Sequence, residues 1–211
     1  GMSGEILFLA HRIPFPPDRG DKIRSHHILR RLAQIAPVHV ATLADDEADL
    51  RHEAELAGIA ATHHLVRRSK PLALAGMQAL AMHSQVSLAA FHTGSIDAYV
   101  RQLLSRRPVA AIYVFSGQMG QYVPDSFSGR VVADFVDVDS AKFEAYAAIG
   151  SGLRGWIDAR EGRLLRQEEA RLARRANVSL LISEAEAALF RERLPTEQRE
   201  RTAVRVLGNG I

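Results

Sequence analysis

Seven short runs of β-branched and aliphatic residues recur along this chain of 211 residues, and longer segments with helical spacing separate them. This alternation is typical of βαβ units, in which helices cover both faces of a parallel sheet. The runs lie at 5–10, 38–43, 62–66, 109–115, 131–137, 178–182 and 204–207. Helices are predicted over 21–36, 46–58, 72–90, 95–106, 117–122, 140–149, 155–176 and 184–193. The sequence therefore predicts a Rossmann-like α/β domain of three layers, with a mostly parallel sheet of about seven strands.

Local patterns add detail to three of these helices. In the first, apolar residues at three- and four-residue steps predict a core-facing stripe, with Arg24 outside it: Ile23, Ile28, Leu32 and Ile35. Ser183 precedes two glutamates, which predicts an N-cap for the last helix. Arginines and glutamates interleave between Arg154 and Arg175, which predicts a salt-bridged surface helix.

Composition excludes several classes of protein. Apolar residues make up 47% of the chain and charged residues 24%, which is typical of a globular domain rather than a disordered segment. Cysteine is absent, so disulfides, thiolate metal sites and cysteine nucleophiles are excluded. Only three of the 27 basic residues are lysines, and the arginines are spread over several segments without interleaved aromatics, which disfavours nucleic-acid binding. The uncharged stretch 71–96 carries too many polar residues for a membrane span.

The segment HRIPFPPDRGDKIRSHH, residues 11–27, is the most specific part of the chain and joins the first strand to the first helix. Ligands of open parallel sheets bind beyond the carboxyl ends of the strands, so this loop lies where a site is expected. Glycine lets backbone approach a ligand, and helix-start amides with basic side chains favour a phosphate or carboxylate. The candidate binding residues are His11, Arg19, Gly20, Lys22 and Arg24. The alternative is a solvated basic helix start after a proline turn.

Two familiar phosphate-binding patterns are missing from this loop. Neither the GxGxxG fingerprint nor a Walker sequence follows the first strand. Orthodox nicotinamide and ATP sites are therefore disfavoured, and we expect no cofactor. The adjacent pairs His26-His27 and His63-His64 point apart on a helix or strand, so we expect no metal site either.

A second candidate segment, VVADFVDVDS, runs from 131 to 140. It carries acids where a buried strand should pass into its loop, and such carboxylates are costly unless they bind a partner or act at a site edge. Asp137 and Asp139 are therefore candidate catalytic residues, with capping of the next helix as the alternative for Asp139. Ser116, just after the strand predicted at 109–115, is a further candidate for lining the cleft.

Together with LGNGI at the end of the chain, PPDRGDKIRS and VDVDS resemble the N-terminal half of a GT-B glycosyltransferase of the retaining GT4 class. The similarity is greatest to the sugar transferases associated with PEP-CTERM/EpsH-type exopolysaccharide loci. It implies that residues 1–211 form the acceptor-side half of a GT-B fold, with a donor-binding C-terminal domain absent. Only Gly20 matches the Gly-Gly pair that the family often carries in its first loop, and Asp137 and Asp139 stand where many relatives carry a histidine.

The resemblance implies an enzyme that transfers a sugar from a nucleotide-sugar donor to a glycan or lipid-linked acceptor in exopolysaccharide biosynthesis. Alone, this half is expected to be inactive. Arg19, Gly20 and Arg24 would face the donor phosphate, and Asp137 or Asp139 would orient or deprotonate the acceptor. We expect a cytoplasmic protein, with peripheral contact at the inner face of the plasma membrane through the Arg154–Arg175 helix as an open alternative.

Two other functions stay open. Asp137-Val-Asp139-Ser140 mimics the DxDx nucleophile motif of haloacid-dehalogenase-type phosphatases, in which the first aspartate attacks phosphate beside Mg²⁺. The motif normally lies near the start of the chain, which it does not do here. A non-catalytic α/β module that binds a sugar or nucleotide is the second alternative, since such sheets host unrelated functions.

Overall fold

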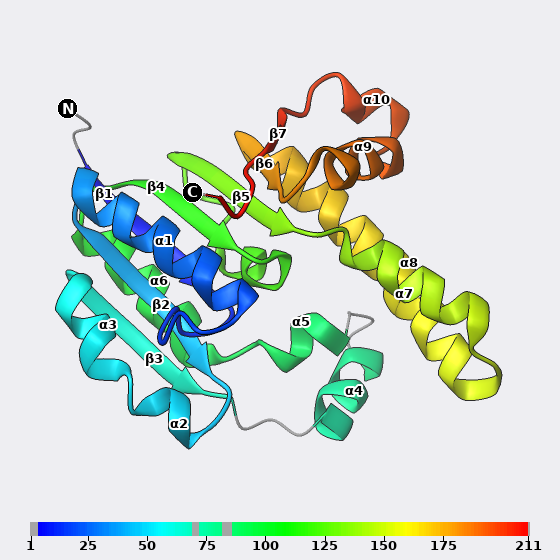
Figure 1. Ribbon diagram of the computed structural model, residues 1–211, viewed down its shortest axis with the longest axis horizontal. Coiled ribbons are helices and arrows are strands. Elements are labelled where there is room, and N and C mark those ends of the chain that lie inside the picture. Colours follow the sequence, from blue (N-terminus) through cyan, green and yellow to red (C-terminus); the bar gives the residue numbers. More distant parts are fainter. Residues whose placement is uncertain (1–3, 69–71, 82–85, 211) are drawn as a thin grey trace.

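The computed structural model describes residues 4–68, 72–81 and 86–210. Its seven strands form one sheet in the order β3-β2-β1-β4-β5-β6-β7, and every neighbouring pair is parallel (Figure 1). The strands are β1 (Glu5–Ala10), β2 (Val38–Ala44), β3 (Thr62–Arg67), β4 (Val109–Phe115), β5 (Arg130–Val136), β6 (Val178–Leu181) and β7 (Val204–Val206). All seven strands expected from the sequence are therefore confirmed within one or two residues at each end, and the described sheet is parallel throughout.

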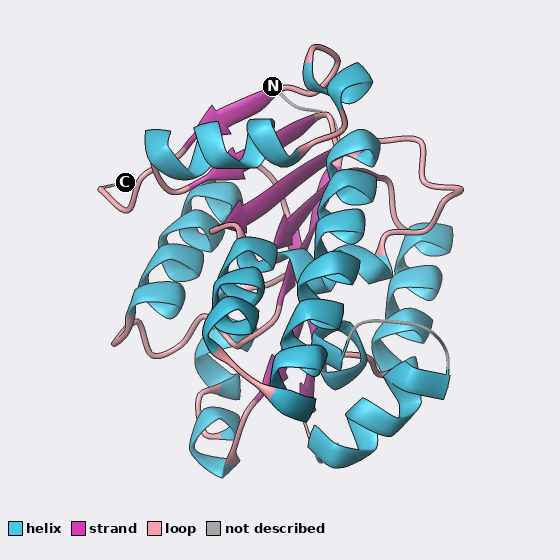
Figure 2. Ribbon diagram, turned by 90° about the vertical axis from the view of Figure 1, so that its right-hand side faces the viewer, coloured by secondary structure: helices cyan, strands magenta, loops and turns pink. Residues whose placement is uncertain are grey.

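Helices cover both faces of the sheet and make a three-layer domain (Figure 2). They are α1 (Gly20–Ile35), α2 (Glu47–Leu50), α3 (Glu53–Ile59), α4 (Leu72–Ala81), α5 (Val86–Ala90), α6 (Gly94–Arg106), the 3₁₀ helix η1 (Gly117–Tyr122), α7 (Asp139–Ile149), α8 (Gly152–Arg175), α9 (Glu184–Arg193) and α10 (Thr196–Arg199). One core cluster packs α1 and α3 against the sheet. The other packs α6, η1, α8 and α9 on the opposite face. The predicted Rossmann-like α/β class is confirmed.

Several helix boundaries differ from the prediction. The helix expected over 46–58 is two short helices, α2 and α3, because Asp46 caps one and the chain turns at His52 to begin the other. The helix expected over 72–90 is α4 and α5, and residues 82–85 between them lie outside the described part. The short helix α10 was not predicted.

The buried face of α1 differs from the predicted stripe. Ile23 and Ile35 are exposed, whereas Lys22 and Arg24 are buried. Lys22 donates to Asp49 at 2.6 Å, and Arg24 forms an ion pair with Asp134. These tertiary ion pairs turn the basic side chains inward, and an apolar count along the helix cannot reveal them.

Helix α8 also departs from the expected surface helix, because two of its glutamates are buried. Glu161 accepts hydrogen bonds from the backbone N–H groups of Val86 and Ser87, at 2.9 and 2.8 Å, and so caps the start of α5. Glu169 accepts from the N–H and Oγ of Ser140, at 3.1 and 2.5 Å, and so caps the start of α7. The negative charges therefore lie at the positive ends of two other helices.

Candidate functional site

The site predicted at the carboxyl edge of the sheet lies where the strand order reverses. After β1 the chain continues to β2 on one side, while β4 pairs with β1 on the other. Such a switch point leaves a crevice between the loops that follow the two central strands. The loop after β1 and Ser116 after β4 flank that position.

Ion pairs hold the loop between β1 and α1. Arg12 donates from Nε to Asp45 at 2.7 Å and from Nη1 to Asp21 at 2.9 Å. Arg19 makes only longer contacts with the same two carboxylates, both at 3.6 Å, and its side chain is half exposed. Arg12 is therefore anchored, while Arg19 is available to a ligand.

The start of α1 is open. Arg19 is its N-cap residue, and its side chain makes no capping hydrogen bond. A Cβ placed on Gly20 would meet no atom within 4 Å, so there is free space beside this residue. The first-turn amides of a helix have no partner within the helix and carry partial positive charge. An anion can approach this helix end.

His11 lies beside the same loop and is buried. Its ring stacks on Phe115 and meets Phe91 edge to face. Burial lowers the pKa of His11, although Asp21 opposes this shift. His11 Nε2 lies 3.1 Å from Arg12 Nη1 and 3.5 Å from a carboxylate oxygen of Asp21. Nδ1 is buried and has no hydrogen-bond partner, which costs about 1–3 kcal/mol when the group stays unsatisfied.

Lys22 and Arg24 are built into the core rather than facing this opening. Besides Asp49, Lys22 Nζ contacts the carbonyl oxygen of Phe15 at 3.3 Å. Arg24 donates from Nε and Nη2 to the two oxygens of Asp134, at 3.2 and 3.1 Å, and also to the carbonyl of Leu207. The sequence places both basic side chains among the phosphate-binding candidates. In the structure, Lys22 holds α1 to α2 and to the preceding loop, and Arg24 holds α1 to β5.

Asp137 and Asp139 lie together after β5, as predicted. Lys142 Nζ is 3.2 Å from Asp137 and 3.6 Å from Asp139. Burial raises the pKa of Asp139, and the charge of Asp137 adds to this shift while Lys142 opposes it. The capping alternative for Asp139 is not observed, because the N-cap residue of α7 is Val138 and the carboxylate at this helix start is that of Glu169. The pair borders a small hollow with Gly117 and Gln118, and Gly20 does not line it.

Two non-glycine residues with positive φ end neighbouring strands here. Ser116 has φ 81° and Val136 has φ 67°, in the region that favours glycine. Such residues cost about 1–3 kcal/mol each and tend to persist at functional sites. The strained backbone therefore marks the same edge of the sheet as the candidate side chains.

Replacing Ser116 by glycine is expected to raise the free energy of unfolding by about 1 kcal/mol, because glycine adopts this backbone without strain. Chemical denaturation measures the change. Ser183→Gly, at an N-cap with extended backbone, is the matched control and should not stabilise the protein. A destabilised Ser116→Gly variant would mean that the hydroxyl bonded to Gln118 outweighs the strain.

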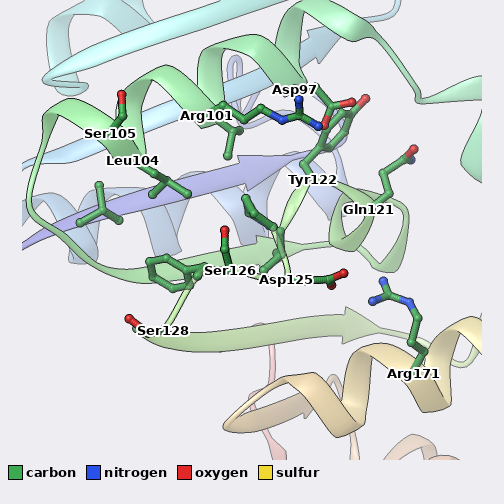
Figure 3. Close-up of a pocket in the computed structure, with 16 residues that line it drawn as sticks. Asp97, Arg101, Leu104, Ser105, Gln121, Tyr122, Asp125, Ser126, Ser128 and Arg171 are labelled. Carbon is green, nitrogen blue, oxygen red and sulfur yellow. The ribbon is translucent and has the colours of Figure 1, made fainter.

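A larger hollow lies elsewhere, in a groove of about 1000 Å³ between α6, the 123–129 loop and α8 (Figure 3). Its charged side chains gather at one end, and these are Asp97, Arg101, Asp125 and Arg171. Val109 and Gly129 place its other end beside the amino-terminal ends of β4 and β5. Ligand sites of parallel sheets lie at the carboxyl ends, so the crevice at the switch point is the better candidate despite its smaller hollows.

Sequence reasoning missed the anchoring residues of this edge. Asp21 and Asp45 hold Arg12, and no local pattern pairs residues so far apart in the chain. Lys142 could have been found, because three residues separate it from Asp139 on a predicted helix. Within the described residues, no group of three or more histidines, aspartates or glutamates is placed to hold a metal ion.

Among the comparisons with known proteins, only solved structures show a likeness to this chain. No protein-family model matches the sequence, and no curated protein matches it. The fold resembles the N-terminal domain of trehalose-6-phosphate phosphatase from Candida albicans, with a TM-score of 0.51 and 14% sequence identity. The match covers 98% of this chain and 48% of that one, so the chain spans about half the length of that structure. At this identity the likeness shows the fold alone.

This finding overturns the glycosyltransferase interpretation. The matched structure is a domain of a phosphatase, and no family model supports the GT4 resemblance. The expectation of a retaining GT4-type enzyme of exopolysaccharide biosynthesis, with a nucleotide-sugar donor, is therefore corrected. One fold hosts many unrelated functions, so short motifs in the loops of a parallel sheet are a weak guide to chemistry.

None of the helices that the structure describes combines the length and the hydropathy needed to span a membrane.

Proposed function

We propose that this domain binds a phosphorylated carbohydrate in the crevice between the β1–α1 loop and the turns after β4 and β5. The observation that carries this proposal is the uncapped start of α1, with half-exposed Arg19 and open Gly20, next to buried His11 whose Nδ1 lacks a partner. The helix-start amides and the Arg19 guanidinium donate hydrogen bonds, which suits the oxygens of a phosphate monoester.

The carbohydrate part of the proposal rests on the two carboxylates that follow β5. Asp137 and Asp139 present carboxylate oxygens, which accept hydrogen bonds from sugar hydroxyls. The domain of similar fold belongs to a protein named for trehalose 6-phosphate, which makes a sugar phosphate the first ligand class to test.

The typical binding free energies of these contacts indicate which residue contributes most to phosphate binding. A helix end contributes only about 0.3–1 kcal/mol to anion binding. A charge-assisted hydrogen bond contributes about 1.5–3 kcal/mol. Arg19 should therefore supply most of the affinity for the phosphate.

Arg19→Ala is expected to weaken binding of trehalose 6-phosphate or glucose 6-phosphate by roughly 10- to 100-fold, because the phosphate loses a charged partner. Isothermal titration calorimetry measures the change, with trehalose and glucose as ligands that lack the phosphate. Arg30, an exposed arginine on the same helix, gives the matched control, and Arg30→Ala should bind as the wild type does.

Equal affinity for phosphorylated and unphosphorylated sugars would contradict the proposal. So would a wild-type affinity in Arg19→Ala, provided that its thermal unfolding is unchanged.

Hydrolysis of a phosphate monoester is a second candidate, favoured by the position of Asp137 beside Asp139. In that reaction Asp137 attacks phosphorus, and Asp139, whose pKa burial raises, gives its proton to the leaving oxygen. Water then cleaves the aspartyl phosphate. Magnesium fits poorly here, because the described residues offer no cluster of ligands and Lys142 already pairs with both carboxylates.

The test is release of p-nitrophenol from p-nitrophenyl phosphate, with and without Mg²⁺. Turnover that disappears in Asp137→Asn would support hydrolysis. No release by the wild type, together with binding of sugar phosphates, would leave the domain as a binding module.

We place this binding activity in the cytoplasm at the inner face of a membrane, again as a proposal. A chain without cysteine suits a reducing compartment.

A further inference from the structure

The hairpin formed by α7 and α8 ends in four exposed apolar side chains, which we call the apolar tip. Exposed fractions are 87% for Ile149, 73% for Leu153, 56% for Trp156 and 51% for Tyr146. Soluble proteins rarely leave large apolar side chains gathered at one place unless the patch contacts something. We propose that the apolar tip inserts into the headgroup region of an anionic lipid bilayer.

The shape of the hairpin suits a bilayer. The two helices pack against each other and project beyond the sheet, and the tip lies at their far end (Figure 1). A close turn joins them, since a Cβ on Gly155 would lie 3.1 Å from the carbonyl oxygen of Gly150. A projecting tip buries little area on a flat protein partner, whereas a bilayer can surround it.

The charges near the tip are complementary to anionic lipid. Between residues 145 and 167 the exposed charged side chains are all arginines, namely Arg154, Arg163 and Arg166. The two acids of this segment, Asp158 and Glu161, are buried. A basic surface is therefore presented beside the apolar tip, as at membrane interfaces.

The aromatic residues of the apolar tip are also of the types found at membrane–water interfaces. Tryptophan and tyrosine are enriched at headgroup level, because their rings are apolar and each carries one polar group. Trp156 and Tyr146 lie on the two helices of the hairpin, on either side of its turn.

Helix α4 extends the apolar surface. Leu74, Met77 and Leu80 are exposed at three-residue steps, while Ala75 and Ala79 are buried. Arg160 of α8 donates to the carbonyl oxygen of Ala79 at 3.3 Å, so α4 lies beside the hairpin, one turn from Trp156. This face of α4 is therefore open.

Trp156 is the single tryptophan of the chain, so its fluorescence reports directly on the tip. Vesicles of equal parts phosphatidylglycerol and phosphatidylcholine should shift its emission to the blue, and lipids brominated near the headgroup should quench it. Vesicles of phosphatidylcholine alone should bind several-fold more weakly. Added salt should weaken the binding to anionic vesicles, because it screens the arginines.

Leu153→Ser is expected to lower the vesicle partition coefficient about tenfold, and Ile149→Ser similarly, because each removes one inserted side chain. Ile35→Ser is the control, an exposed apolar residue on α1 that should leave the partition coefficient unchanged.

Two results would overturn the proposal. One is an unshifted and unquenched Trp156 in the presence of anionic vesicles. The other is a blue shift that needs no lipid and grows with protein concentration, because the tip would then be covered by a second copy of the chain. Sugar-phosphate binding measured without vesicles is independent of both results, so the two proposals can fail separately.

Discussion

Replacing Arg24 by methionine is expected to lower the free energy of unfolding by about 3–5 kcal/mol, because it leaves a buried carboxylate without its cation. Asp134 is almost fully buried at the centre of the sheet and is held by Arg24 and by Tyr113, whose Oη donates at 2.7 Å. Burial raises the pKa of Asp134, while Arg24 and Tyr113 oppose that shift. Urea denaturation measures the loss.

A double variant separates the ion pair from the packing around it. Arg24→Met with Asp134→Leu should recover much of the stability, since apolar replacements of buried ion pairs are often tolerated. Recovery should be incomplete, because Arg24 also donates to the Leu207 carbonyl. Arg30→Met on the exposed side of α1 should change stability by less than about 0.5 kcal/mol. An Arg24→Met protein as stable as the wild type would mean that the ion pair contributes nothing.

The protein is expected to lose about 3 kcal/mol of stability as pH rises from about 4.5 to about 7, through Glu169. Burial raises the pKa of Glu169 from 4.5 to about 7, although its hydrogen bonds from Ser140 lower it. Between these values the folded protein holds a proton that the unfolded chain has released. The contribution of Glu169 to the free energy of unfolding is therefore fully present at low pH. It is lost as pH rises through the pKa of Glu169 in the folded state.

Glu169→Gln should remove this slope, since the amide stays neutral at every pH. The difference in unfolding free energy between the variant and the wild type, measured at several pH values, cancels the contributions of the histidines. Glu197→Gln, on an exposed residue, should follow the wild type. A wild-type slope in Glu169→Gln would assign the pH dependence to other groups.

Much of the fold could be predicted because its signals are local. Each strand is a short run of branched apolar residues, and the predicted cap at Ser183 is confirmed, since its side chain accepts from the N–H of Glu186. The candidate loop after β1 and the acids after β5 could also be predicted, because chain order fixes which loops follow parallel strands. Their positions at the carboxyl edge follow from the same rule.

What the sequence could not reveal depends on partners far away in the chain. Arg24 and Asp134 are 110 residues apart, and the spacing on α1 alone favours an exposed arginine. Glu161 and Glu169 look like surface glutamates among arginines, although each faces the start of another helix. The glycosyltransferase expectation failed for a related reason, because short loop motifs say where a site lies and little about its chemistry.

The two buried glutamates of α8 lie eight residues apart on the same helix, and each accepts hydrogen bonds at the start of a different helix. A shift of α8 along its axis would move Glu161 away from the start of α5 and Glu169 away from the start of α7 at the same time. Because α7 carries Asp139 in its first turn and α5 follows the exposed helix α4, one helix supports both the turn that holds the candidate acids and the segment next to α4.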